Sequence, residues 1–196
     1  MAVQEAEQNV RWRRSLREAR DEARRDGKLV LIYLWHHNCG GSKTMEAETY
    51  PDGGVQAYTE QHFVPVRFNV LERPEVAERF NSGWTPTTIV EDAEGREHRR
   101  SQGYLDPERF IGEVALARLM DAIDRGDFEA ASDRLEEALE RTRDDPAREP
   151  EALYWSAVVA FRLSGDREDL SEGWNRLIDE FPRSEWAKRA AYIRQQ

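Results

Sequence analysis

Cysteine is the scarcest informative residue in this chain of 196 residues, because Cys39 is the only one. A single cysteine cannot form a disulfide within the chain. The sulfur is therefore either an inert thiol or a group that reacts with an external partner.

Long hydrophobic runs are also missing. No window approaches the roughly 18 to 20 apolar residues that a membrane-spanning helix needs, and Met1–Arg14 contains no apolar stretch that could serve as a signal sequence. We therefore expect a cytoplasmic protein without membrane contact, in a compartment where a thiol stays reduced.

The chain has no excess of positive charge. Its net charge is −10, and its arginines alternate with Asp and Glu, as is typical of solvated helix faces. This pattern argues against nucleic-acid binding, which needs a basic surface. Hydrophobic residues make up 39% and aromatic residues 10%, which favours a folded chain, long enough for one domain and a smaller second one.

The first part of the chain alternates between helical and strand patterns. Leu29–Trp35 is a nearly continuous apolar run of strand length, which indicates a central strand covered on both faces and hence an α/β layer structure. The other predicted elements are helices over Val10–Asp26 (ended by Gly27), Ser42–Thr49, Val55–Gln61, Pro74–Phe80 and Asp106–Ile123, and strands over Phe63–Val70, Thr87–Val90 and Arg96–Tyr104, the last two joined by a turn at Glu94-Gly95.

Residues 10–119 resemble a thioredoxin-like domain. The residues that carry the resemblance are Gly27-Lys28, Leu34-Trp35, Cys39 with Lys43, Phe63-Val64-Pro65-Val66 and Trp84-Thr85-Pro86-Thr87. The resemblance implies a thioredoxin fold, with a mixed central sheet flanked by helices. It also implies that Pro86 is cis and faces the thiol, and that Trp84, Thr85 and Pro86 bind the backbone of a substrate.

The resemblance implies that Cys39 is the nucleophile and that Ser42 occupies the position of the second, resolving cysteine. A helix start close behind Cys39 favours its thiolate, and Lys43, His36 and His37 could add positive charge. A hydroxyl cannot form a disulfide, so a mixed disulfide on Cys39 would need an external thiol, such as glutathione as co-substrate, for its release.

Two further positions depart from the family pattern. Asn38 replaces the Trp that usually precedes the first cysteine, and Tyr33 aligns with the buried acid that assists proton transfer in ordinary thioredoxins. Efficient dithiol reduction is therefore not expected. The sequence favours monothiol thiol–disulfide exchange, or capture of protein or glutathione thiols. The alternative is a redox-silent adaptor in which Cys39 is an inert remnant.

Other cofactors have little support. A metal site needs three or four ligands, and beside Cys39 the chain offers only His36, His37 and the distant His62 and His98. We expect no metal and read the two neighbouring histidines as loop residues. The run Cys-Gly-Gly-Ser also resembles the Cys-Gly-Phe-Ser motif of monothiol glutaredoxins, which hold iron–sulfur clusters, but that likeness is limited to this short motif.

The last part of the chain is rich in Ala, Glu and Arg and predicts helices only. The pattern Gly126-Asp127-Phe128, followed by Ala131, Leu135 and Ala138, recurs as Gly165-Asp166, followed by Leu170, Trp174 and Leu177. It resembles a pair of tetratricopeptide repeats. We therefore predict a thioredoxin-like domain over residues 1–123 and a tetratricopeptide-like domain over residues 124–196. The second domain would either bind a partner protein or only cover the last helix of the first.

Overall fold

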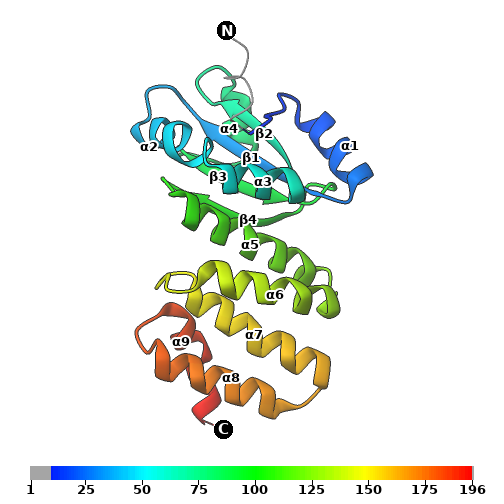
Figure 1. The fold of residues 1–196 in the computed structure, drawn as a ribbon, viewed down its shortest axis with the longest axis vertical. Coiled ribbons are helices and arrows are strands. Elements are labelled where there is room, and N and C mark those ends of the chain that lie inside the picture. The colour runs from blue at the N-terminus through cyan, green and yellow to red at the C-terminus, as the bar shows by residue number, and fades with distance from the viewer. Residues whose placement is uncertain (1–9, 196) are drawn as a thin grey trace. The chain divides into compact units, whose positions relative to one another are not determined.

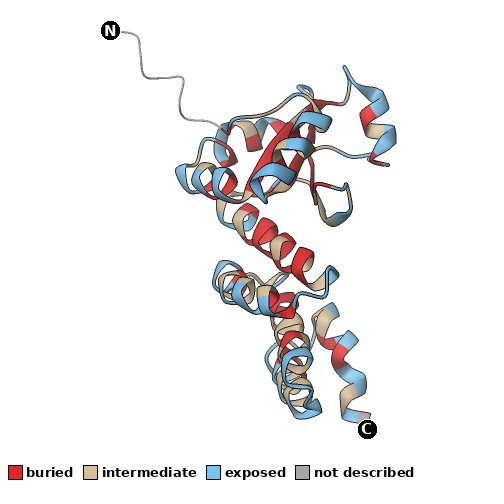
Figure 2. Ribbon diagram, turned by 90° about the vertical axis from the view of Figure 1, so that its right-hand side faces the viewer, coloured by how far each residue is buried: buried red, intermediate tan, exposed pale blue. Residues whose placement is uncertain are grey.

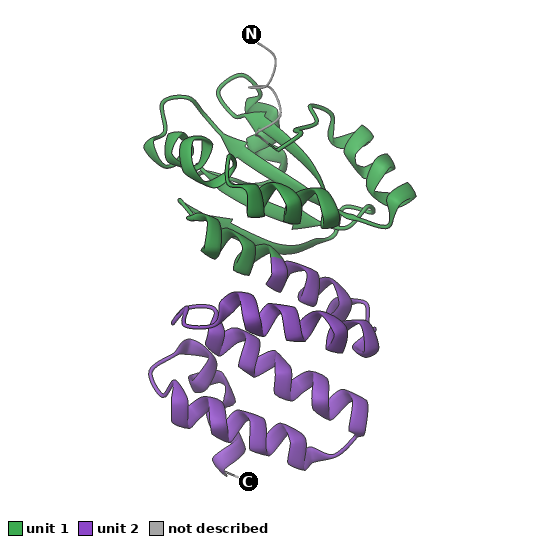
Figure 3. Ribbon diagram, viewed as in Figure 1, with its two compact units in different colours: residues 1–114 green, residues 115–196 purple. Residues whose placement is uncertain are grey.

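The computed structural model of the chain describes residues 10–195 (Figure 1). It divides into two compact units, residues 1–114 and residues 115–196 (Figure 3). The division falls inside helix α5 (Pro107–Asp124), which is the helix predicted over Asp106–Ile123. The sequence had suggested a boundary nine residues further on, at the end of this helix.

Unit 1 is built on a four-stranded mixed sheet of order β2-β1-β3-β4. The strands are β1 (Leu29–Trp35), β2 (Phe63–Asn69), β3 (Thr87–Glu91) and β4 (Glu97–Gln102). Strand β2 is parallel to β1, whereas β3 is antiparallel to β1 and β4 is antiparallel to β3. Strand β1 therefore lies inside the sheet, between β2 and β3. Its five middle residues are buried, which explains why its sequence is almost entirely apolar.

Helices cover both faces of this sheet. On one face lie α1 (Leu16–Asp26) and α4 (Pro74–Arg79), and on the other lie α2 (Gly40–Thr44), the π-helical segment η1 (Met45–Thr49), α3 (Gly53–His62) and the start of α5. Alternate side chains of β1 point to opposite faces of the sheet. Val30, Ile32 and Leu34 join the apolar cluster with α1 and α4, while Tyr33 packs on Tyr50, which in turn packs on Phe110. Figure 2 shows β1 and much of α5 as continuous buried stretches.

The helix predicted from Val10 begins later, at Leu16. Ser15 caps its N-terminus by accepting a hydrogen bond from the Glu18 N–H, and Gly27 ends it in a left-handed conformation as expected. The preceding residues extend along β2 instead, because the Arg13 backbone bonds to Pro65 and Arg67 on the open edge of that strand. The prediction for residues 10–15 was wrong because an available strand edge competes with helix formation.

Unit 2 contains only helices: the second part of α5, α6 (Phe128–Thr142), α7 (Glu149–Ser164), α8 (Arg167–Glu180), α9 (Glu185–Ala190) and the short η2 (Ala191–Gln195). The two copies of the sequence repeat begin alike. Gly126 and Gly165 both adopt positive φ, and Asp127 and Asp166 cap α6 and α8 with their side chains. The all-helical second region is thus confirmed, while its tetratricopeptide character stays a prediction.

Within unit 2, α8 approaches α7 closely at Gly173. A Cβ added there would lie 2.6 Å from the Ala157 Cβ, so only glycine fits without a shift. Among residues 10–195, no helix is both long and apolar enough to cross a bilayer.

Candidate functional site

Cys39 is the N-cap residue of α2, at the exit of β1. The chain turns after Trp35, with the Cys39 N–H bonded to the His36 carbonyl at 3.1 Å, and enters the helix at Gly40. The sequence predicted the start at Ser42, two residues too late. Gly40 and Gly41 occupy the first two helical positions, where backbone N–H groups have no intrahelical partner, so glycine does not break the helix there. Cys39 is therefore part of the helix cap itself rather than a residue of a loop ahead of it.

The cap position directs backbone donors at the sulfur. The Ser42 N–H donates to the Cys39 Sγ over 3.5 Å, in the way that an N-cap oxygen would accept it. On its other side, the Cys39 Sγ lies 3.1 Å from the Thr85 carbonyl oxygen, to which an S–H group can donate. The sulfur thus has an acceptor for its proton in the thiol form and donors for its charge in the thiolate form.

The Thr85–Pro86 peptide bond is cis, as the family resemblance implied, and the loop faces the thiol. Pro86 is buried and packs against the first turn of α2. A Cβ on Gly41 would lie 2.9 Å from the Pro86 Cδ, so the close approach of this loop to the helix depends on glycine at position 41.

The surroundings of Cys39 lower the pKa of its thiol. Desolvation is the largest single influence and raises the pKa, but it is outweighed by the nearby Ser42 and Thr85 side chains and by the Ser42 and Gly41 backbone N–H groups, all of which favour the thiolate. The sulfur is only partly buried and remains open to a reaction partner.

Ser42 is fully buried beneath the cap. Its Oγ has no geometrically defined hydrogen-bond partner in the described part of the chain, although it lies close enough to Cys39 to favour the thiolate. The Tyr33 hydroxyl donates to the Ser42 carbonyl over 3.4 Å. Burial raises the pKa of Tyr33 well above its usual value, so its phenol is neutral at physiological pH.

The sequence suggested Lys43, His36 and His37 as sources of positive charge near the sulfur. Lys43 is exposed and forms no ion pair with any residue from 10 to 195. The His36 Nδ1 accepts the Asn38 N–H at 3.2 Å, and the His37 Nδ1 lies 3.5 Å from the Asn69 side-chain amide. Both histidines take part in local loop contacts, and the described residues hold no group of three or more His, Cys, Asp or Glu suited to a metal ion.

Two exposed aromatic side chains belong to the cis-proline region. Trp84 precedes Thr85 and is 63% exposed, and Tyr104 is 40% exposed. The Tyr104 hydroxyl donates to Glu48 over 2.7 Å, and its Cβ is 3.8 Å from the position that a Gly41 Cβ would take. The sequence had suggested Trp84 as a binding residue but not Tyr104. A large aromatic residue directly after Gly103, in the connection from β4 to α5, was the available signal.

The mixed sheet, the thiol at a helix start and the opposing cis-proline together define a thioredoxin-fold domain. Residues 16–117 match the family model for the thioredoxin-like domain, and the chain belongs to this family. No curated protein matches the sequence.

Solved structures agree on the fold. A thioredoxin from Thermus thermophilus is 25% identical with a TM-score of 0.53, and the alignment covers 60% of this chain and 95% of that protein. The DsbH oxidoreductase is 17% identical with a TM-score of 0.50, covering 56% of this chain and 84% of its own.

Proposed function

We propose that this protein carries out monothiol thiol–disulfide exchange through Cys39. The observation that carries the proposal is the position of this sulfur as the N-cap of α2, with the Ser42 N–H at 3.5 Å and the cis-proline loop at 3.1 Å. A lowered pKa and partial exposure are the two properties that distinguish reactive cysteines from structural ones.

In the proposed reaction, the Cys39 thiolate attacks one sulfur of a disulfide R–S–S–R′. A bond forms between Cys39 and the sulfur of R, the original S–S bond breaks, and R′ leaves as a thiolate that takes a proton from water. Electrons are conserved because one disulfide replaces another. Thr85 and Pro86 border the sulfur and would hold the chain that carries R, with the exposed Trp84 as a further contact.

The mixed disulfide then needs a second thiol from outside the chain. Ser42 occupies the position of a resolving cysteine, but its hydroxyl cannot displace the partner sulfur to form a disulfide. We propose that glutathione or another thiol attacks the mixed disulfide, becomes joined to R and releases the Cys39 thiolate. A reducing compartment such as the cytoplasm would supply that thiol.

Alkylation by iodoacetamide tests the reactivity of Cys39. Because the folded state lowers the pKa of Cys39, the rate should reach half of its maximum at a pH below about 8.5, the usual value for a free thiol. Intact mass reports the reaction directly, since the chain has one cysteine, and the same protein in urea is the matched control. A folded protein that titrates at or above the unfolded control would refute the proposal.

Exchange itself can be followed with oxidised glutathione. The wild-type chain should gain one glutathione and lose it again when reduced glutathione is added. Ser42→Cys is the informative variant, because a thiol at position 42 should eject the glutathione and leave an internal disulfide. Ser42→Ala should keep the adduct but, without its hydroxyl, should titrate at higher pH than the wild type.

The alternative function is a redox-silent adaptor. It is favoured by the second unit, where α6 and α8 repeat the same glycine and aspartate cap, as tandem helical repeats that bind partner proteins do. A pull-down of partner proteins with wild type and with Cys39→Ser, both first shown to be folded by circular dichroism, separates the two functions. If both proteins retain the same partners equally, the adaptor interpretation is supported and the exchange proposal is not.

A further inference from the structure

Unit 1 carries a groove on the face of its sheet that α1 and α4 cover. Four hollows of about 470, 240, 230 and 360 Å³ adjoin one another there, because Phe80 and Arg79 each line three of them. We call this the α1–α4 groove. Its walls come from α1, α4 and the β3–β4 hairpin. Cys39 begins α2, which lies on the opposite face of the sheet, so this groove is separate from the thiol site.

The lining of the α1–α4 groove is basic, although the chain as a whole has a net charge of −10. Seven arginines and four acidic residues line the hollows. Three of the arginines belong to α1 (17, 20 and 24), two flank or lie in α4 (73 and 79), one is on β4 (100) and one precedes α1 (14). Local positive charge attracts anionic ligands to this surface, although the net negative charge of the protein repels them elsewhere.

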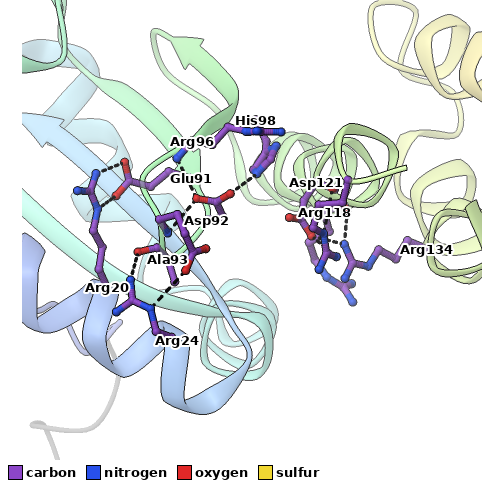
Figure 4. Close-up of polar contacts among 12 residues, drawn as sticks. Arg20, Arg24, Glu91, Asp92, Ala93, Arg96, His98, Arg118, Asp121 and Arg134 are labelled. Carbon is purple, nitrogen blue, oxygen red and sulfur yellow. Dashed lines mark hydrogen bonds and ion pairs between the residues drawn. The ribbon is translucent and has the colours of Figure 1, made fainter. Parts of the chain in front are cut away.

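Several of these arginines are fixed by the fold. The Arg20 guanidinium donates to both carboxylate oxygens of Glu91, at 2.6 and 2.8 Å, and Glu91 is almost fully buried. Arg24 donates to the Ala93 carbonyl at 2.9 Å, as Figure 4 shows beside the Arg20 pair. Arg100 donates to the Phe80 carbonyl at 2.9 Å and to Glu97. The walls of the groove are thus held in place before a ligand arrives.

Two lining arginines, Arg14 and Arg79, remain available. Arg79 is exposed, and its guanidinium forms no ion pair or hydrogen bond within residues 10–195 and lies 5.9 Å from the Phe80 ring centroid. It lines three of the four hollows and so stands where they join. The other five lining arginines each have a carboxylate partner: Arg17, Arg20, Arg24, Arg73 and Arg100. Of the two without one, Arg79 lines three hollows and Arg14 only one.

The floor of the groove is apolar. Phe68, Val76 and Phe80 belong to the core cluster under α1 and α4, and Leu16 packs against it. A ligand that matched this surface would carry carboxylates for the arginines and apolar side chains for the floor. The arginines are distributed along two helices and a strand rather than gathered around one buried point, which favours an extended ligand over a single phosphate group.

We propose that the α1–α4 groove binds an acidic peptide segment of a partner protein, with a carboxylate on Arg79 and apolar side chains over Leu16 and Phe80. The proposal does not depend on the chemistry of Cys39.

Fluorescence anisotropy with a labelled peptide of four Glu-Glu-Leu repeats tests this directly. Binding should weaken as salt is raised, and Arg79→Glu should weaken it at least tenfold. Arg183→Glu is the matched control: it makes the same charge change on an exposed residue of unit 2 that has no ion pair in the described chain. Since Arg79 contributes no ion pair to the fold, both variants should unfold at the wild-type urea concentration.

The possible results separate the alternatives. Loss of peptide binding in Arg79→Glu, with binding retained in Arg183→Glu and in Cys39→Ser, supports the groove. Equal loss in both arginine variants would mean general charge attraction and overturn it, as would no binding at all. Tighter binding of a labelled twelve-nucleotide oligo-dT, or competition by inorganic phosphate as effective as that by unlabelled peptide, would identify a different ligand and also overturn the proposal.

Discussion

Gly41 and Gly40 form a natural pair for measuring how tightly the cis-proline loop packs on the thiol-bearing helix. Both begin α2, and both have ordinary helical φ values, so replacement by alanine changes backbone freedom similarly at the two sites. Around Gly40 an added Cβ would meet nothing within 4 Å, whereas at Gly41 it would lie 2.9 Å from the Pro86 Cδ. The two alanine variants therefore differ mainly in this one contact.

The size of the effect follows from the geometry. Carbon atoms pack best at about 3.5–4.0 Å, so the new methyl at position 41 would be at least about 0.6 Å too close to the proline ring. The ring has no rotatable side-chain bond with which to move away, and overpacking of this kind costs about 1–3 kcal/mol. Gly→Ala by itself contributes about 0.5–1 kcal/mol in favour of a helix. Gly41→Ala should be about 1–3 kcal/mol less stable than Gly40→Ala, and Gly40→Ala at least as stable as wild type.

Urea titration followed by tryptophan fluorescence and far-UV circular dichroism measures the difference. The alkylation rate of Cys39 supplies a local readout, because displacement of Pro86 also moves the Thr85 carbonyl away from the sulfur. If the two alanine variants unfold at the same urea concentration and are alkylated at the same rate, Pro86 does not press on the helix start, and this description of the site is wrong.

Three other changes test separate parts of the molecule. Gly173→Ala should destabilise unit 2 by about 1–3 kcal/mol through its 2.6 Å contact with Ala157, seen as an earlier loss of helical circular dichroism; an unchanged curve would contradict the close helix packing. Glu91→Gln should cost about 3–5 kcal/mol, because it removes the buried carboxylate that pairs with the partly buried Arg20, and Arg20→Met combined with it should recover part of that loss in the same urea assay. Cys39→Ser should lower stability more at high pH than at low pH. The folded state lowers the Cys39 pKa, so the thiolate stabilises the fold fully above the unfolded value of about 8.5 and less as pH falls through the folded value; a gap independent of pH would contradict this.

Local signals were sufficient for the elements that form the centre of unit 1. Leu29–Trp35 forms β1 over its full predicted length, because a strand buried on both faces needs an apolar residue at almost every position. Asp106 precedes α5 as expected, and its carboxylate accepts the Arg109 N–H, the capping contact typical of Asp before Pro.

Features that depend on distant parts of the chain were not accessible in this way. Residues 10–15 extend along β2 because a strand edge is available there, and no local pattern reports an available edge. The π-helical turn over Met45–Thr49 has a composition that an ordinary helix would also accept. The α1–α4 groove combines arginines from positions 14 to 100, which lie together only after the sheet has formed.

The candidate site also has features that the sequence predicts and features that it does not. The identities of Cys39, Ser42 and Pro86 could be taken from the sequence, since the family resemblance assigns their positions. The pKa of Cys39 could not be predicted, because it depends on the distances from the sulfur to its hydrogen-bond partners. The lowered pKa of Cys39 results from donors in the first turn of α2 and from the loop at Thr85, some 46 residues further along the chain.

Tyr33 and Ser42 are in contact beneath the helix start and have to be considered together. In thioredoxins that this domain resembles, a buried acid beneath the helix start assists proton transfer when the second thiol attacks. A buried carboxylate is costly unless it is paired or hydrogen-bonded. Here position 42 has a hydroxyl, and the site beneath it holds a neutral phenol that packs on Trp12 and Tyr50 and donates to the Ser42 carbonyl. Tyr33 thus supports the helix start whose donors lower the Cys39 pKa, and the described chain has no second thiol beside it. In the exchange reaction that we propose, the site supports the first step, the attack by Cys39, and an external thiol would perform the release of the captured partner.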